Sequence, residues 1–456
     1  MADSRKTSTG RRTASGNTRK SSSDTRKSGG TRKTSSDTRK TSSGTRRTAS
    51  GTRRTASDTR GTAYEYEDDY TGDAPEETRK KHDRHEFRNY ALLYLGLIAV
   101  INVIFWVSPP ACEFYVRYCH PVFLNIYGRF TSLFPFSVGE LLIVLGLLIV
   151  FLSLFFWIPL VRHRKARRKP NSYYLSKFWY RVVIAIILNV AMIMTLNCVS
   201  MYHRDTLDPN PDSTRTDYTF DELFTLRNYL VSEANRLAEE MPRDENGNVT
   251  YDGDLQADCK AALHRISDSY PLLSGWYPKV KNMLFSDFMS QMYMAGYYFP
   301  FTLEANVNAD MYIMNYPACY CHELAHTHGY IYEDEANFIA FLACMESEND
   351  FLRYSAILSV AGYVESDLME SAGDTDPASL PDFVYWTEQA GNDDIFLQPE
   401  KWEEIEEDAI LSTEVVDSVS DTLTETSLQL NGVESGMASY SEVVGLLLQY
   451  YDGKLY

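Results

Sequence analysis

One short stretch of the sequence combines the residue types that hydrolytic metal chemistry needs. His322-Glu323-Leu324-Ala325-His326 places two histidines four positions apart. On a helix both imidazoles lie on one face and can bind one Zn²⁺ at about 2.0–2.1 Å. Glu323 can take a proton from a zinc-activated water molecule and pass it to a leaving amine. The pattern therefore predicts His322 and His326 as zinc ligands and Glu323 as the general base.

A helix with two ordinary surface histidines would show the same five letters, so the residues that follow matter. Gly329 can end the motif helix, and residues 333–344 form a second helical pattern with acidic residues in its first turn. Glu333 shares a face of this second helix with Asn337 and with small residues such as Ala336, which allows the two helices to approach closely. We therefore expect Glu333 to be the third zinc ligand, supported by Asn337 one turn further on.

Glu335 is the competing third ligand, because it lies in the same first turn. It is about 200° of rotation from Glu333 on an ideal helix, and its face carries bulky residues such as Phe338 that would hold the helices apart. The metzincin pattern also begins with His-Glu-x-x-His-x-x-Gly, but it needs a ligand where this chain has Tyr332. His328 lies on another side of the motif helix, and we expect it to be exposed to solvent.

Three apolar runs precede the motif, and each is close to the roughly 20 residues that cross about 30 Å of hydrocarbon as a helix. They are Tyr90 to Val107, Phe136 to Leu160, and Phe178 to about Ser200. Basic residues flank the cytoplasmic ends of membrane spans, and Lys and Arg are abundant before the first span and in the loop Arg162 to Lys169. We therefore expect a multi-pass protein of the plasma membrane with a cytoplasmic N-terminus, an outer loop at 108–135, and everything after about residue 201 outside.

The net charge of −18 conceals a basic and an acidic part of the chain. Residues 1–60 hold 17 Lys plus Arg against 4 acidic residues, whereas residues 201–456 hold 12 against 47. The basic part repeats a short unit, seen in Thr38-Arg39-Lys40-Thr41-Ser42-Ser43-Gly44, with almost no large apolar residue. We expect residues 1–88 to be a disordered cytoplasmic arm that contacts anionic lipid headgroups. No nucleic acid partner is expected, since the basic repeats in residues 1–60 contain no aromatic residue for stacking.

Residues 201–456 predict a mostly helical soluble domain. Thr219-Phe220-Asp221-Glu222 is a capping box that starts a helix to about Met241. Further expectations are a helix at 255–267, short strands within 292–314, an acidic and loop-rich part at 373–425, and a last amphipathic helix at 440–451. The seven cysteines are mostly small buried residues in this interpretation, although Cys112 and Cys119 share the outer loop and a disulfide between them is open.

The site and the spans together carry a resemblance to known families. Glu333 and Asn337 resemble the gluzincin arrangement, in which a glutamate on a later helix completes the zinc site. The three spans, Phe134-Pro135-Phe136-Ser137, and the stretches 299–308 and 322–344 are similar to an uncharacterised bacterial membrane family, labelled a domain of unknown function and presumed to be zincin-like. The similarity covers roughly residues 88–456. It implies a zincin-like fold and a metal site but no substrate.

The expected fold is an α-helical membrane protein with three transmembrane helices at 89–200, followed by a mostly α (α+β) zincin-like extracytoplasmic domain at 201–456. In zincins an edge strand before the motif helix often pairs with the substrate backbone, and residues 298–308 can form either such a strand or plain sheet. We expect a membrane-anchored zinc metallopeptidase that hydrolyses peptide bonds in proteins or peptides. The alternative is a membrane sensor or signal transducer of the same fold with limited or no general proteolysis. A purely structural anchor is disfavoured by the intact motif.

Overall fold

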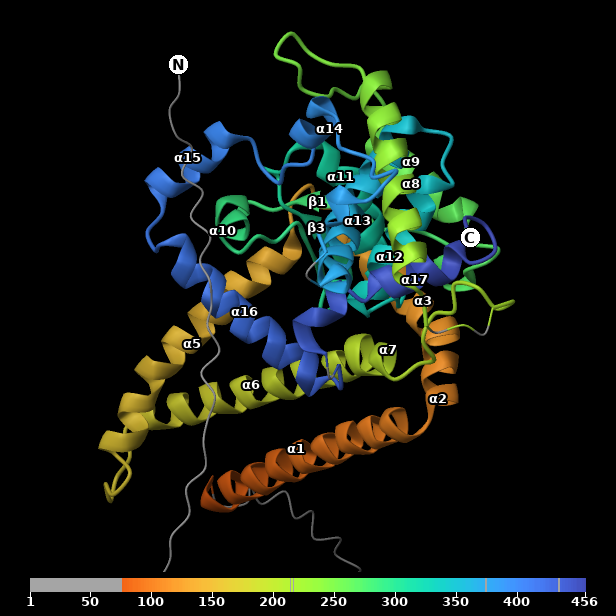
Figure 1. Cartoon of the computed structure of the whole chain (residues 1–456). Coiled ribbons are helices and arrows are strands. Elements are labelled where there is room, and N and C mark those ends of the chain that lie inside the picture. The colour runs from red at the N-terminus through yellow and green to blue at the C-terminus, as the bar shows by residue number, and fades with distance from the viewer. Residues whose placement is uncertain (1–75, 214, 216, 374, 434) are drawn as a thin grey trace, which may run out of the picture. The chain divides into compact units, whose positions relative to one another are not determined.

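The chain is mostly helical, with a small sheet beside the helix that carries the motif (Figure 1). The computed structural model describes residues 76–213, 215, 217–373, 375–433 and 435–456. The basic repeats and the lipid contact expected of the arm therefore lie outside the described residues.

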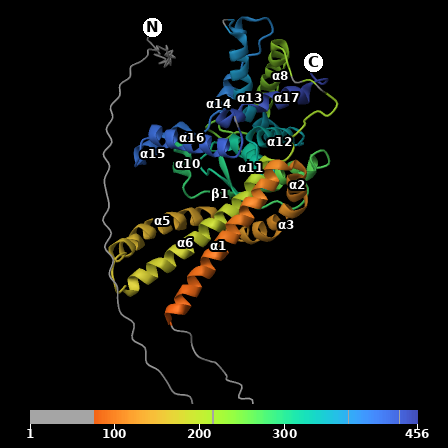
Figure 2. The ribbon, with the colours of Figure 1, turned by 90° about the horizontal axis from the view of Figure 1, so that it is seen from below.

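Three of the described helices are long and apolar enough to cross a membrane, as the sequence predicts. They are His85–Val107 within α1 (Glu76–Val107), α5 (Val138–Arg162), and a continuous Asn171–Tyr202 helix built from α6 (Asn171–Met194), η3 (Thr195–Val199) and α7 (Ser200–Tyr202). The third helix lies beside the other two (Figures 1 and 2). Tyr94 donates a hydrogen bond to Asn189 across one contact, and Trp179 donates to Ser153 across the other. Most of their apolar side chains are exposed, as expected for contact with lipid.

The connection between the first two spans is helical and docks on the rest of the protein. It consists of α2 (Pro109–Phe114), η1 (Tyr115–Cys119), α3 (His120–Phe123), η2 (Leu124–Gly128) and α4 (Arg129–Thr131). The buried His120 forms a 2.9 Å hydrogen bond from Nε2 to the Thr327 carbonyl, at the end of the motif helix. Cys112 and Cys119 are both free thiols.

The core of the second part is a set of helices around the motif helix. These are α8 (Phe220–Glu240), α9 (Leu255–Arg265), α11 (Tyr316–Thr327), α12 (Glu333–Met345) and α13 (Asp350–Ala372), with α17 (Val443–Tyr451) packed on α12. The predicted capping box at Thr219 and Glu222 is present, and the apolar stripe from Leu223 to Leu237 is buried. This stripe packs on α13, so the residues that recur at helical spacing in the sequence form part of the hydrophobic core.

The small sheet consists of β1 (Lys281–Asn282), β2 (Gly296–Phe299) and β3 (Glu304–Val307) in the order β1-β3-β2. Strands β1 and β3 are parallel, and β2 is antiparallel to β3. Short strands were predicted within residues 292–314, and β2 and β3 confirm them. The short helix α10 (Ser286–Gln291) and the 3-10 turns η4 (Pro271–Leu273) and η5 (Ile313–Asn315) complete this region.

The sheet is fastened to the second and third membrane helices. The buried Glu304 carboxylate accepts hydrogen bonds from the backbone N–H of Val138 (3.1 Å) and Gly139 (2.8 Å) at the start of α5. It also pairs with the buried Lys281 ammonium group. From the third span, Asn197 donates a 2.7 Å hydrogen bond to the Pro300 carbonyl, just after β2. The β2–β3 hairpin is therefore held at these helix ends.

The acidic part at 373–425 is more helical than we expected. After η6 (Pro377–Ser379), it forms α14 (Glu388–Asp393), α15 (Pro399–Asp408) and α16 (Thr413–Leu430), followed by η7 (Gly436–Tyr440). The expectation of loops was wrong here because α16 needs few apolar contacts: only Val416 and Leu428 are buried, and most other side chains of this Ser- and Thr-rich helix are exposed. The many Ser, Thr and Asp residues of α16 have low intrinsic helix propensity, so the sequence of this segment gives only a weak helix signal.

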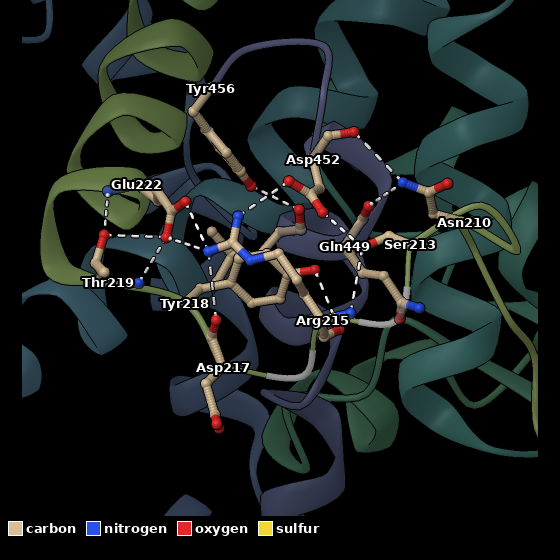
Figure 3. Close-up of polar contacts among 11 residues, drawn as sticks. Asn210, Ser213, Arg215, Asp217, Tyr218, Thr219, Glu222, Gln449, Asp452 and Tyr456 are labelled. Atoms are coloured by element: carbon tan, nitrogen blue, oxygen red, sulfur yellow. Dashed lines mark hydrogen bonds and ion pairs between the residues drawn. The ribbon is translucent and has the colours of Figure 1, made fainter.

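The end of the chain is tied to the segment that leaves the third span (Figure 3). The Arg215 guanidinium bridges Glu222 at 2.8 Å and Asp452 at 3.0 Å. Ser213 donates a 2.6 Å hydrogen bond to Asp452, and Asn210 donates to the Gln449 carbonyl at 3.1 Å. Arg215 is 41% exposed, so these ion pairs contribute little stability and mainly fix where α17 ends.

Candidate metal centre

A tight turn brings the motif helix and the following helix face to face. Gly329 adopts φ +101°, a conformation that glycine reaches without steric cost. Its N–H donates to the His326 carbonyl at 3.1 Å, and the N–H of Tyr330 donates to the Ala325 carbonyl at 3.2 Å. These bonds end α11 in the way the sequence predicts, and α12 then begins at Glu333 and packs back on α11.

The turn places three potential metal ligands together. One donor atom from each of His322, His326 and Glu333 lies within 4.8 Å of the others. Glu333 Oε2 is 3.1 Å from His322 Nε2 and 3.5 Å from His326 Nε2. The three residues that the spacing predicted as ligands therefore share one site, and Glu323 lines the same cavity.

Glu335 points away from this cluster. Its buried carboxylate pairs with the Arg204 guanidinium and accepts a 2.6 Å hydrogen bond from the backbone N–H of Leu207. Arg204 also donates a 3.0 Å hydrogen bond to the Gly329 carbonyl. Glu335 thus fastens the chain that follows the third span to the turn between the two helices.

A hydrogen bond orients the His326 ring. His326 Nδ1 lies 2.7 Å from the Tyr330 carbonyl, so this nitrogen carries the proton and donates it, which leaves Nε2 toward Glu333. Asn337 lines the same cavity as His322, and its Nδ2 has no hydrogen-bond partner among the described residues. A carbonyl partner such as that of Tyr330 fixes the ring and the tautomer of a metal-binding histidine.

The charges of the cluster depend strongly on one another. Burial favours a neutral Glu333, but His326 and the hydrogen bonds from both histidines bring the Glu333 pKa well below its usual value. Burial likewise disfavours a charged His326, but Glu333 raises the His326 pKa to about 9. The pKa of His322 is lowered by burial and by His326. The buried Glu333 carboxylate therefore favours a positive charge next to it, and a bound metal cation would supply that charge.

Glu323 is a buried carboxyl group with one unpartnered oxygen. Its Oε2 accepts no hydrogen bond from any described residue, and burial raises its pKa to about 8 against the influence of His326. Gly296 on β2 lies directly against it, because a Cβ at Gly296 would stand 2.7 Å from both Cδ and Cγ of Glu323. No spacing in the sequence indicated this contact, which joins residues on a strand and a distant helix.

The cluster lines a cavity of about 890 Å³. Its walls come from α11, α12, α13, the strand β2, the third membrane helix and the α16–η7 segment. Among the described residues no Lys or Arg lines it, whereas Asp394, Asp417 and Asp421 do. Tyr440 from η7 lies beside Glu333, and burial followed by that carboxylate raises the Tyr440 pKa, so its hydroxyl stays protonated. Sequence reasoning assigned Tyr440 only to a helix start.

His328 is buried, which corrects our expectation of solvent exposure. Its Nδ1 lies 3.2 Å from the Leu324 carbonyl, and its ring packs on Tyr277 with centroids 4.1 Å apart. Burial lowers its pKa to about 3, so the ring is neutral. The expectation failed because the helix face opposite the motif histidines is covered by the segment around Tyr277, which no local pattern reveals.

A family profile described as "Protein of unknown function (DUF3810)" matches residues 115–448. The chain belongs to this family. In the DUF3810 chain the match begins in η1, ends within α17, and includes the second and third membrane helices together with the whole site. No curated protein and no solved structure matches the chain.

Proposed function

We propose that this protein is a membrane-anchored zinc metallopeptidase of the gluzincin type, with His322, His326 and Glu333 as ligands and Glu323 as the general base. The observation that carries the proposal is the convergence of three donor atoms within 4.8 Å beside a buried carboxylate that has a free oxygen. A buried carboxylate oxygen without a hydrogen-bond partner is unusual in a purely structural cluster and is typical of a functional site.

The donor set fits zinc. Two imidazole nitrogens and one carboxylate are the three protein ligands of many catalytic zinc sites, which keep a fourth position for water or substrate. When bound here, zinc would supply the Lewis acidity that lowers the pKa of a water molecule towards about 7 and polarises a peptide carbonyl.

The residues of this chain supply the remaining chemistry. Glu323 accepts a proton at Oε2 from the attacking water and delivers it to the leaving amine, which balances the hydrolysis. The Tyr330 carbonyl holds the His326 imidazole in place, and Asn337 is placed to act in the same way on His322. Tyr440 lines the same cavity as Glu333, and its hydroxyl stays protonated.

The free edge of β2 can bind the substrate backbone as an added strand. Asn308 N–H donates to the Ala295 carbonyl, so hydrogen-bonded pairs of the antiparallel ladder recur at Tyr297 and Phe299. Gly296 and Tyr298 then direct their N–H and C=O groups away from β3. No strand covers that side of β2 among the described residues.

The decisive test replaces Glu323 with Gln in the full chain purified in lipid nanodiscs. Glu323→Gln keeps the shape of the side chain but cannot accept the proton, so we expect normal zinc content by elemental analysis and at least about a 10²-fold loss of peptide-library cleavage. Glu233→Gln, at a partly exposed position of α8 that does not line the cavity, is the matched control. Cleavage by Glu323→Gln at the wild-type rate would remove the proposed mechanism.

We place the site outside the cytoplasm. The support is the Lys and Arg content of residues 162–169 compared with the 108–135 connection, which has Arg117 and Arg129 alone. A reporter that is active only outside the cytoplasm, fused after Asp208, should score positive. A reporter that is active only in the cytoplasm should be silent at the same position.

A further inference from the structure

The catalytic cavity reaches down the third membrane helix. Met194, Cys198 and Tyr202 line the same cavity as His322 and Glu323. All three belong to the Asn171–Tyr202 helix that is long and apolar enough to span a bilayer. Met194 lies eight residues before the end of that helix, which corresponds to about 12 Å along its axis. A substrate in this cavity is therefore in contact with a membrane-spanning segment.

The strand that can hold the substrate runs from the catalytic carboxylate to the ends of two membrane helices. At one end of β2, Gly296 lies against Glu323. At the other end, Phe299 packs on Gly139 at the start of α5, and the next residue, Pro300, accepts the hydrogen bond from Asn197. Three residue steps of extended chain cover about 10 Å. A peptide lying along β2 thus leaves the site directly at the membrane boundary.

Exposed apolar side chains surround the same region and indicate that it rests on lipid. Leu284, Phe285 and Phe288 of the α10 segment are 74%, 55% and 49% exposed. The backbone N–H groups of Leu284 and Phe285 donate to the Glu140 carboxylate in the first turn of α5, which fixes them at the end of the second span. Large apolar groups at such a position are typical of the membrane interface.

The helix α16, which forms one wall of the cavity, continues this apolar surface. Residues Val415, Val419, Leu423 and Leu430 are more than half exposed and recur at helical spacing, while Asp417 of the same helix lines the cavity. Gln291 at the end of α10 donates a 3.0 Å hydrogen bond to the Leu411 carbonyl, which joins α10 to the segment just before α16. At its other end, Gly432 lies next to Trp106 of the first span.

From these contacts we propose that the substrates are polypeptides that are themselves anchored in the membrane, cut within a few residues of the anchor. The proposal rests on the peptidase function proposed above and specifies its substrate class. The substrate can enter along β2 from the bilayer side while its anchor stays in the lipid. The apolar surface of α10 and α16 holds the site at the depth where the substrate chain emerges from the bilayer. A free soluble peptide gains nothing from this geometry.

The test uses the full chain in proteoliposomes with synthetic single-span substrates. Each substrate carries the same cleavable segment, chosen from the peptide library, joined to an apolar helix by a spacer of about 4 or about 24 residues. The same segment without the helix is the soluble control. Effective concentration falls roughly as the −3/2 power of linker length, so we expect cleavage about 15-fold faster with the short spacer at equal surface density.

A binding measurement separates this inference from the catalytic one. The Glu323→Gln chain, with a photo-reactive residue in place of Phe301 in the cavity wall, should cross-link to the short-spacer substrate and only weakly to the long-spacer one. Equal cleavage and cross-linking for both spacers and for the soluble peptide would overturn the membrane-anchored substrate while leaving the peptidase intact. If the wild-type chain cleaves none of the substrates faster than Glu323→Gln does, both proposals fail.

Discussion

Glu333 and Glu335 lie two positions apart at the start of α12, and the structure gives them opposite roles that a matched pair of substitutions separates. Glu333 faces the two histidines, whereas Glu335 faces Arg204. We expect Glu333→Ala to lose zinc while the fold persists. We expect Glu335→Ala to keep the zinc site while the protein loses stability.

The magnitudes follow from the surroundings of each carboxylate. Loss of residues that merely support a ligand already weakens metal binding 10–100-fold, so removal of Glu333 itself should cost more than about 100-fold, or about 2.8 kcal/mol. Glu335→Ala leaves the Arg204 guanidinium, whose side chain is only 5% exposed, without its counter-ion. Breaking a buried ion pair in this way costs about 3–5 kcal/mol.

Both quantities can be measured on the same samples. Zinc content after dialysis against a weak chelator, followed by competition titration, gives the metal affinity. The unfolding midpoint of the zinc-free protein gives the stability, free of the contribution that bound metal makes. Glu333→Ala should shift chiefly the first measurement and Glu335→Ala chiefly the second.

One outcome would refute the reasoning. If Glu335→Ala lost zinc and remained as stable as the wild type, while Glu333→Ala kept zinc, α12 would have to be rotated from the orientation described here. The ion pair between Glu335 and Arg204 would then be absent as well, which a charge-reversed double variant could check.

Three further predictions concern the surroundings of the site. Gly296→Ala should displace the Glu323 carboxylate and lower peptidase turnover at least about tenfold with zinc retained. As a control, Gly362→Ala should leave turnover unchanged, because a Cβ at Gly362 meets no atom within 4 Å. Normal turnover for Gly296→Ala would contradict the contact between Gly296 and Glu323. Glu304→Ala should leave the buried Lys281 without its partner and destabilise the protein by about 3–5 kcal/mol in thermal or denaturant unfolding. The partly exposed pair of Glu233 and Arg236 contributes less than about 1 kcal/mol, and equal effects of removing either pair would show that the buried pair is unimportant. Replacing both cavity acids Asp417 and Asp421 with Asn should reduce cleavage of Lys-containing peptides relative to Glu-containing ones by several-fold at low salt, and an unchanged preference would remove the acidic wall from substrate selection.

The part of the site that could be predicted from the sequence is the part that is local. The two motif histidines, the glycine turn and Glu333 lie within a dozen residues, so the 3.6-residue period and the length of the turn fix which side chains can meet. The three apolar helices follow from length and composition for the same reason. The capping box of α8 is likewise a signal within four residues.

Only the tertiary structure decided what surrounds those residues. His328 is buried because Tyr277 covers it, and Gly296 meets Glu323 because β2 crosses the motif helix. Tyr440 and Glu333 line the same cavity although more than a hundred residues separate them, and Glu304 binds the start of α5 from 165 positions away. Such contacts depend on how whole helices and strands pack, and packing leaves no periodic trace in the sequence of either partner. The grouping of the three candidate ligands could therefore be predicted from the sequence, whereas the cavity, its acidic wall and its position at the membrane helices arise only from the folded chain.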